Sequence, residues 1–219
     1  MLPLNLLATP DKDAHILCLG AHCDDIEIGC GGTLLELLAN HPNLHVTWVV
    51  FASTPSRKSE AERGASLFSE GAKSLDLRIL DFKDGYVPTE SARLKDEFEQ
   101  LKKGIVSPDL IFTHYRYDLH QDHKAVSDLT WNTFRNHLIL EYEIPKWDGD
   151  MGIPNTFYPL SGGVGQTKIK HLQQAYNSQK TKKWFTDDLF WSLMRIRGME
   201  CNSQSTLAEG FHVRKMTVS

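Results

Sequence analysis

The sequence predicts an α/β fold: a doubly wound, mostly parallel, Rossmann-like sheet with strand order 3-2-1-4-5, flanked by helices. Apolar runs of strand length alternate with segments of helical periodicity over the first 150 residues, which is the pattern of repeated βα units. Runs such as VTWVVF at 46–51 are almost continuously apolar, as strands covered on both faces are. With 219 residues, 41% of them hydrophobic, the chain can fill one core, so we predict a single domain over 1–219.

The predicted elements alternate regularly as far as residue 137. The strands span 15–20, 45–52, 78–82 and 109–113, and the helices that follow them span 31–39, 57–74, 91–104 and 122–137. Residues 139–165 are rich in turn formers and predict loops that form the walls of a pocket. Helices near 166–176 and 184–197 follow, and the last twenty residues fit an edge strand or an irregular tail.

Glycines precede the first predicted helix. Residues 29–33 (GCGGT) predict tight turns, with Thr33 as the helix cap. They do not form a dinucleotide-binding loop, because His22, Asp24 and Asp25 stand where glycines would approach a pyrophosphate. Two carboxylates there would repel that group, which argues against a nucleotide-binding oxidoreductase.

Composition excludes several classes of function. Lys and Arg (24) nearly balance Asp and Glu (28), and a net charge of -4 indicates neither nucleic acid nor an anionic membrane surface as partner. The four cysteines lack paired spacing, so we expect reduced thiols. We find no basic signal-peptide region and no apolar stretch of the roughly 18 residues that a membrane span needs. We therefore predict no integral membrane segment and a cytoplasmic location.

Two clusters of metal-binding residue types follow predicted strands. Residues 20–25 (GAHCDD) come directly after the first strand, and residues 118–123 (DLHQDH) follow the fourth. Imidazole and carboxylate groups are common ligands of zinc. In an open parallel sheet, ligands bind beyond the carboxyl ends of the strands, where the strand order reverses, and strands one and four are neighbours there. We therefore expect the two clusters to meet, although about 100 residues separate them.

The spacing leaves the roles within the clusters open. His120 and His123 are three residues apart, so one can bind a cation while the other faces the substrate. Asp122 fits either a residue that fixes the tautomer of a ligating histidine or a cap of the following helix. The adjacent carboxylates of Asp24 and Asp25 would repel each other without a cation, which favours a metal site.

These residues resemble a known family. Residues 21–25 (AHCDD), the downstream Gly31-Gly32 and residues 120–123 (HQDH) are similar to the A-H-P-D-D and H-x-D-H motifs of the PIG-L/LmbE-like N-deacetylases. The resemblance runs from about residue 14 to 137, and residues 209–211 (EGF) are similar to a weaker Ala-Glu-x-Phe feature. It implies a zinc-dependent deacetylase.

The resemblance also implies a role for each matched residue. The implied roles are zinc ligands for His22, Asp25 and His123, general base for Asp24, and electrostatic or acid partner for His120. Three protein ligands leave a zinc position open for a water, whose pKa falls to about 7. Either His120 or the protonated Asp24 would then give a proton to the leaving amine. Cys23 stands where the family usually has proline, and we expect it to be a bystander rather than a thiolate ligand.

The rim of the predicted site offers candidates for substrate binding. Arg57 begins an R-x-x-E sequence that is similar to a feature of the family, and its guanidinium could reach a substrate oxygen. Arg63 is the alternative, and a solvated arginine on a helix face is the simpler interpretation. Trp147 is the better candidate for stacking on a sugar, whereas Trp131 and Phe134 have the helical spacing of core residues.

The leading hypothesis is a hydrolase that uses Zn²⁺ to remove the acetyl group from the 2-acetamido group of an N-acetylglucosamine-like sugar or conjugate. The predicted partner is a small-molecule amino-sugar conjugate, and residues 139–165 could also serve as a homo-oligomer interface or a lid. The alternative from another class is a non-catalytic sugar-binding domain that keeps a hydrolase-like pocket.

Overall fold

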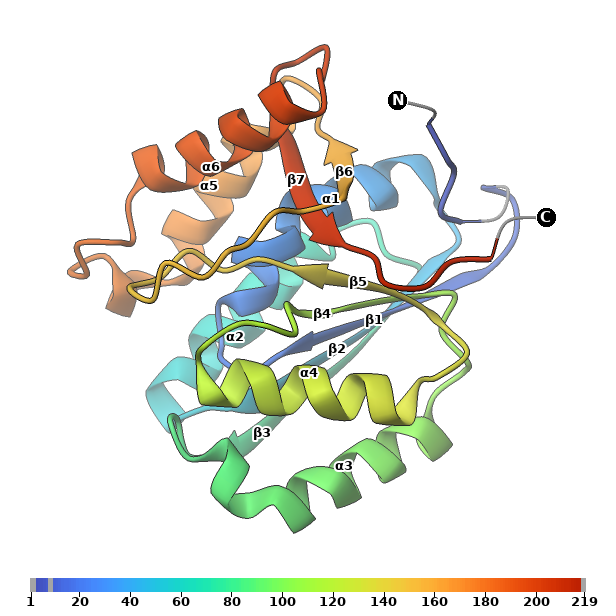
Figure 1. Ribbon diagram of the computed structural model, residues 1–219, viewed down its shortest axis with the longest axis vertical. Coiled ribbons are helices and arrows are strands. Elements are labelled where there is room, and N and C mark those ends of the chain that lie inside the picture. The colour runs from blue at the N-terminus through green and yellow to red at the C-terminus, as the bar shows by residue number, and fades with distance from the viewer. Residues whose placement is uncertain (1–2, 8–9, 218–219) are drawn as a thin grey trace.

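The computed structural model describes residues 3–7 and 10–217, and a mixed sheet runs through its centre. The strands are β1 (Ala14–Gly20), β2 (Leu44–Ala52), β3 (Ser74–Phe82), β4 (Leu110–His114), β5 (Leu138–Tyr142), β6 (Thr156–Pro159) and β7 (Ala208–His212). Their order is β3-β2-β1-β4-β5-β7-β6, and the first five are parallel (Figure 1). The predicted order 3-2-1-4-5 is therefore confirmed, and two antiparallel strands extend the sheet beyond β5.

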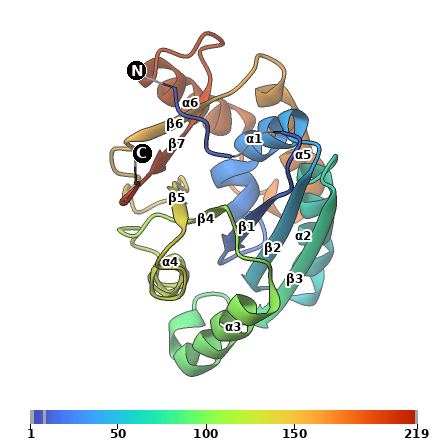
Figure 2. The ribbon, with the colours of Figure 1, turned by 90° about the vertical axis from the view of Figure 1, so that its right-hand side faces the viewer.

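Helices cover both faces of the sheet, as Figure 2 shows. The α-helices are α1 (Asp25–Asn40), α2 (Pro55–Phe68), α3 (Ser91–Gly104), α4 (Gln121–Thr133), α5 (Val164–Ala175) and α6 (Asp187–Glu200). Short 3-10 helices lie at Val87–Glu90 (η1) and Asn177–Gln179 (η2). Helices α1, α2 and α5 pack together on one face, and α3 and α4 lie on the other.

Strand β1 shows why this sheet has a core on each face. Its side chains alternate, so that Ile16 and Cys18 join the cluster under α1 and α2, whereas Leu17 and Leu19 join the cluster under α3 and α4. Successive residues of a strand point to opposite faces, so a strand covered on both sides must be apolar at nearly every position. The continuous apolar runs in the sequence follow from this arrangement.

The first helix begins earlier than predicted. Helix α1 starts at Asp25 rather than residue 31, and the buried Thr33 lies inside the helix instead of capping it. The glycines serve close packing: a Cβ on Gly29 would lie 2.2 Å from Cδ2 of Tyr142, and one on Gly31 would lie 2.5 Å from Cε1 of Phe68. The predicted turn was wrong because these contacts come from distant strands and helices.

Other boundaries also differ from the prediction. The helix predicted over 57–74 ends at Phe68, and the helix predicted over 122–137 ends at Thr133. Residues 139–165, which we predicted as loops, contain most of β5 and all of β6. The C-terminal segment forms β7, which pairs with both β5 and β6 and so is an inner strand.

A buried ion pair joins β7 to the middle of α1. Nζ of Lys168 on α5 donates to Oε1 of Glu209 at 2.5 Å and to the carbonyl of Ile28 at 2.6 Å. Glu209 also accepts the backbone N–H groups of Gly32 at 2.8 Å and Thr33 at 2.7 Å. The Glu209 carboxylate thus accepts hydrogen bonds from N–H groups of α1, and the Lys168 ammonium group donates one to a carbonyl of the same helix.

Replacing Lys168 with methionine is expected to lower the free energy of unfolding by about 3 to 5 kcal/mol, because Glu209 is left buried without its cation. Chemical denaturation measures the change. Lys170→Met is the matched control, since Lys170 lies on the same helix but is exposed, and it should change stability by less than about 0.5 kcal/mol. Equal effects of the two substitutions would contradict a special role for the buried pair.

Among the described residues, none of the helices combines the length and the apolar character needed to cross a membrane.

Candidate metal and active site

The two clusters meet beyond the carboxyl ends of β1 and β4, which are parallel neighbours. Nδ1 of His22 lies 3.1 Å from Nε2 of His123. Asp25, at the start of α1, reaches both: one carboxylate oxygen lies 3.3 Å from Nδ1 of His22 and the other 3.5 Å from Nε2 of His123. Adjacent strands therefore bring these three side chains together, as the strand order requires.

These distances fit the ligands of one tetrahedral cation. Zinc holds nitrogen and oxygen ligands at about 2.0–2.1 Å, so that two ligands of a tetrahedral site lie about 3.3 Å apart. Nδ1 of His22 and Nε2 of His123 lie 3.1 Å apart, and each has one oxygen of the Asp25 carboxylate, Oδ2 at 3.3 Å and Oδ1 at 3.5 Å respectively, so the separations lie around this value.

Carboxylates behind the two imidazoles indicate which nitrogen of each faces the centre. Nε2 of His22 lies 3.1 Å from Oδ2 of Asp122, and Nδ1 of His123 lies 2.9 Å from Oδ2 of Asp118. An N–H directed at each carboxylate leaves the lone pair of the opposite nitrogen pointing inward, which is the usual arrangement around a metal-binding histidine. Two nitrogen lone pairs and the Asp25 carboxylate therefore face one another, and a positive charge between them would stabilise this arrangement.

The balance of charges supports the same conclusion. Burial lowers the pKa of His22, but Asp25, Asp122 and Asp84 outweigh it and hold that pKa well above its usual value. Burial raises the pKa of Asp25, but the surrounding imidazoles, first that of His123, hold it well below the usual range. The donor set therefore fits a divalent cation.

Other sets of donor atoms overlap with this one. The ligand atoms of His22, His120 and His123 lie within 4.8 Å of one another, and so do those of Asp25, His114 and His123, and those of His22, Asp84 and Asp122. Nε2 of His114 accepts the backbone N–H of Ala21 at 2.9 Å, so its lone pair is already in use. Nδ1 of His120 accepts the N–H of Asp122 at 3.3 Å, which makes His120 the cap of α4 and places its proton on Nε2.

Asp122 is thus not the helix cap. Its carboxylate holds His22 and also accepts the backbone N–H groups of Gly85 at 2.7 Å and Val87 at 3.1 Å. Sequence reasoning assigned no role to Asp118, and it missed His114 and Asp84 altogether. Asp118 lies inside the cluster at 118–123, and its position there was the available signal. His114 ends strand β4 and Asp84 lies on a separate loop, so neither belongs to either cluster.

Asp24 lies beside this centre and is paired with Arg57. Its Oδ1 is 3.0 Å from Nη2 of Arg57, and the carboxylate is buried. Burial raises the pKa of Asp24, and Arg57 opposes that rise without cancelling it. Arg57 also lines the cavity above the site, whereas Arg63 donates to the carbonyl of Gln174 and is absent from the lining among the described residues.

His120 and Cys23 complete the floor of the site. Burial and the imidazoles of His123 and His22 lower the pKa of His120, so a neutral ring with an Nε2–H donor is favoured over the protonated ring that the role of acid would need. Burial raises the pKa of Cys23 to about 12, and its thiol faces the carbonyl of Ala52. Cys23 is therefore a thiol at neutral pH, as a bystander would be.

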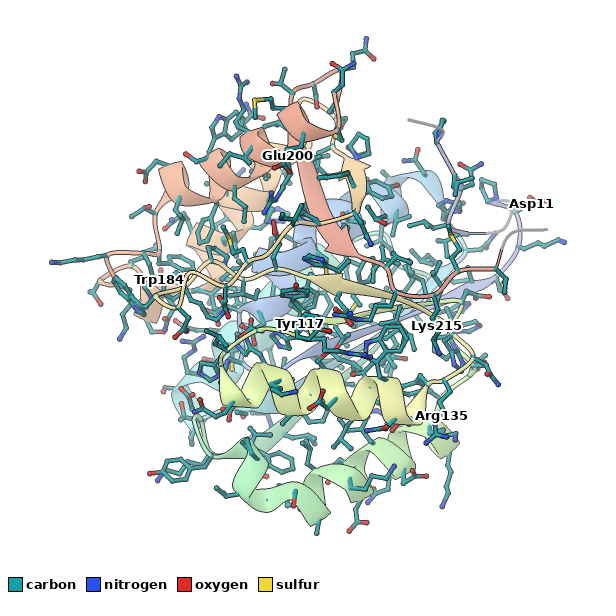
Figure 3. The ribbon with its side chains drawn as sticks, in the orientation of Figure 1. Asp11, Tyr117, Arg135, Trp184, Glu200 and Lys215 are labelled. Carbon is teal, nitrogen blue, oxygen red and sulfur yellow. The ribbon has the colours of Figure 1, made fainter. Side chains whose placement is uncertain are left out.

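A cavity of about 390 Å³ opens above these residues. Its walls come from residues 144–147, as expected of the predicted pocket walls, and from residues 179–184, which sequence reasoning missed. Trp147 is 79% exposed, while Trp131 donates its indole N–H to Glu141 and Phe134 is buried in the core. Figure 3 shows the other wall tryptophan, Trp184, at the edge of the molecule toward which β1 and β5 point.

The fold and the site define a class: a doubly wound α/β protein with a His/Asp cluster suited to a cation beyond its central strands. A family model described as PIG-L: GlcNAc-PI de-N-acetylase matches residues 17–134, more than half of the chain. The chain belongs to this family of de-N-acetylases.

Other known proteins are similar over most of the chain. The uncharacterized deacetylase YaiS of Escherichia coli (strain K12) is 28% identical over 152 residues, which cover 64% of this chain and 80% of that one. The N,N'-diacetylchitobiose deacetylase of Pyrococcus horikoshii is 21% identical with a TM-score of 0.70, over 96% of this chain and 87% of that one.

A hydratase shares the fold as well. GalB, the 4-carboxy-2-hydroxymuconate hydratase of Pseudomonas putida KT2440, is 16% identical with a TM-score of 0.70, over 94% of this chain and 98% of that one. The fold alone therefore does not decide the reaction, which must be argued from the site.

Proposed function

We propose that the protein is a zinc-dependent N-deacetylase that removes the acetyl group from the 2-acetamido group of an N-acetylglucosamine-like sugar or conjugate. The observation that carries this proposal is the convergence of His22, Asp25 and His123 at 3.1 to 3.5 Å beside a buried carboxylate that is not part of the trio. Family membership supports the reaction, and the diacetylchitobiose deacetylase supports an amino-sugar substrate.

The proposed ligands of Zn²⁺ are His22, Asp25 and His123. When bound, zinc lowers the pKa of a water to about 7 and polarises a carbonyl group. Asp122 and Asp118 hold the two imidazoles in the tautomers that ligation requires.

Asp24 is the proposed general base. Its carboxylate lines the cavity, and its raised pKa makes it a stronger base for taking a proton from an attacking water. After taking that proton, the carboxylic acid can return it to the leaving amine. Arg57 holds the carboxylate in one orientation and also faces the substrate cavity, so that it can contact a substrate oxygen as well.

His120 is the proposed electrostatic partner. It lines the cavity, and its Nδ1 is occupied by a backbone N–H. Its Nε2–H is therefore the hydrogen-bond donor that remains for the amide oxygen as negative charge develops there. A donor of this kind contributes roughly 10²- to 10³-fold in kcat.

The test uses purified protein, its zinc content and a panel of acetylated amino sugars that includes N-acetylglucosamine and N,N'-diacetylchitobiose. We expect about one zinc per chain, release of acetate from at least one sugar, and loss of turnover after chelation that zinc restores. Tight sugar binding without acetate release would favour the non-catalytic sugar-binding domain instead. Turnover that survives complete metal removal would contradict the proposal.

A further inference from the structure

A second network surrounds Asp24, and it begins at Tyr176, directly after α5. The Tyr176 side chain is completely buried. Its hydroxyl donates to the carbonyl oxygen of Cys23 at 2.5 Å and also contacts Oε1 of Glu27. The Cys23 carbonyl belongs to the peptide group that joins Cys23 to Asp24. The hydroxyl therefore holds the backbone immediately before the proposed base.

The Asp24 carboxylate does not cap helix α1, although Asp24 occupies the N-cap position. Asp24 is the residue that precedes the first turn of α1, yet its side chain makes no capping hydrogen bond to the helix. An aspartate there normally turns toward the N–H groups of the first turn, which fixes its rotamer. At Asp24 the carboxylate points instead to Arg57, at 3.0 Å. Its placement therefore depends on Arg57 and on the backbone that carries it.

Tyr176 and Arg57 are themselves connected. The guanidinium carbon of Arg57 lies 5.8 Å from the centre of the Tyr176 ring, within the range of a cation–π contact. Arg57 also approaches Glu60 at 3.4 Å, and Glu60 accepts the backbone N–H of Ser178 at 2.7 Å. The turn that carries Tyr176 thus contacts both the peptide before Asp24 and the partner of its carboxylate.

Close packing leaves the hydroxyl little freedom to move. Gly64 of α2 lies against it: a Cβ at this position would come within 2.2 Å of the Tyr176 hydroxyl and 2.3 Å of Oε1 of Glu27. The cysteine at position 23 adds a reason for such a restraint. Unlike a proline, Cys23 leaves its own φ angle free, so the backbone before Asp24 must be held by other contacts.

We propose that Tyr176 is a positioning residue for Asp24, which acts by holding the Cys23 carbonyl and by supporting Arg57 through its ring. This inference rests on the proposed function for the role of Asp24 as base. Tyr176 makes no contact with the cavity: it is absent from the lining among the described residues. Its influence on the reaction therefore passes through Asp24 and through Arg57, the partner of the Asp24 carboxylate.

The test is a double-mutant cycle between Tyr176→Phe and Asp24→Asn. In the native background we expect Tyr176→Phe to lower kcat by roughly 10- to 100-fold with KM nearly unchanged, since a displacement of about 1 Å at a catalytic group has effects of this size. In the Asp24→Asn background the same substitution should have little further effect. Tyr158→Phe, on strand β6, is the matched control and should leave kcat unchanged.

An equal loss of kcat in both backgrounds would overturn the inference, because Tyr176 would then act independently of Asp24. Gly64→Ala, which forces the hydroxyl to shift without removing it, is a second variant that should repeat the pattern, and circular dichroism checks that both variants are folded. Zinc content should stay the same in both variants.

A readout without catalysis separates this inference from the proposed function. In a crystal structure of Tyr176→Phe we expect the Asp24 carboxylate to leave its 3.0 Å contact with Arg57. An unmoved carboxylate would overturn the positioning role, whether or not the protein deacetylates sugars. If Asp24→Asn has no effect on turnover, the base role fails, and the crystal structure alone decides what Tyr176 does.

Discussion

Replacing Asp24 with asparagine is expected to lower kcat by about 10²- to 10⁴-fold while the protein keeps its zinc, because an amide of the same shape cannot accept a proton from water. The carboxylate contacts Arg57 and lies outside the trio of His22, Asp25 and His123, so removing its charge should leave the ligands in place. Steady-state kinetics and metal analysis of the same preparation measure the two quantities.

Asp148→Asn is the matched control for this experiment. Asp148 is an exposed carboxylate on the loop that continues from the cavity wall, and its replacement should change kcat by less than twofold. Full turnover in Asp24→Asn would remove Asp24 from the role of base. Loss of zinc together with turnover would instead make it part of the metal site.

The position of the site could be predicted from the sequence, because it follows from strand order alone. The clusters at 20–25 and 118–123 each follow an apolar strand, and in a doubly wound sheet the carboxyl ends of those two strands are neighbours. The start of α1 could not be predicted in the same way. Residues 29–32 look like a turn in isolation, and only the side chains of Tyr142 and Phe68, from distant elements, make glycine a packing requirement there.

The C-terminal segment was left open between an edge strand and an irregular tail, because the burial of β7 does not show as apolar sequence. Strand β7 (AEGFH) is buried along its whole length although it carries Glu209 and His212. The charge of Glu209 is matched by Lys168, 41 residues away, a partner that no local pattern reveals. His114 and Tyr176 were missed for the same reason: their contacts with the site join side chains to elements far apart in the sequence.

Asp25→Asn and His120→Asn, compared with each other, decide which of two overlapping ligand sets binds the metal. The trio of His22, Asp25 and His123 contains a carboxylate, and the alternative trio of His22, His120 and His123 does not. If Asp25 is the third ligand, Asp25→Asn should weaken zinc binding by more than about 100-fold, since loss of a carboxylate that merely orients a ligand already costs 10- to 100-fold.

His120→Asn should keep its zinc and lose turnover by roughly 10²- to 10³-fold, because an asparagine can still cap α4, whereas the hydrogen bond to the developing oxyanion is removed. Competition with a chromogenic chelator measures both affinities, and circular dichroism checks that each variant is folded. The reverse outcome, with zinc retained in Asp25→Asn and lost in His120→Asn, would assign the metal to the three histidines. Asp25 would then stand beside Asp24 as a second carboxylate without a metal, and either could be the base. The affinity of these two variants for zinc therefore determines whether Asp24 is the single candidate for the general base among these two carboxylates.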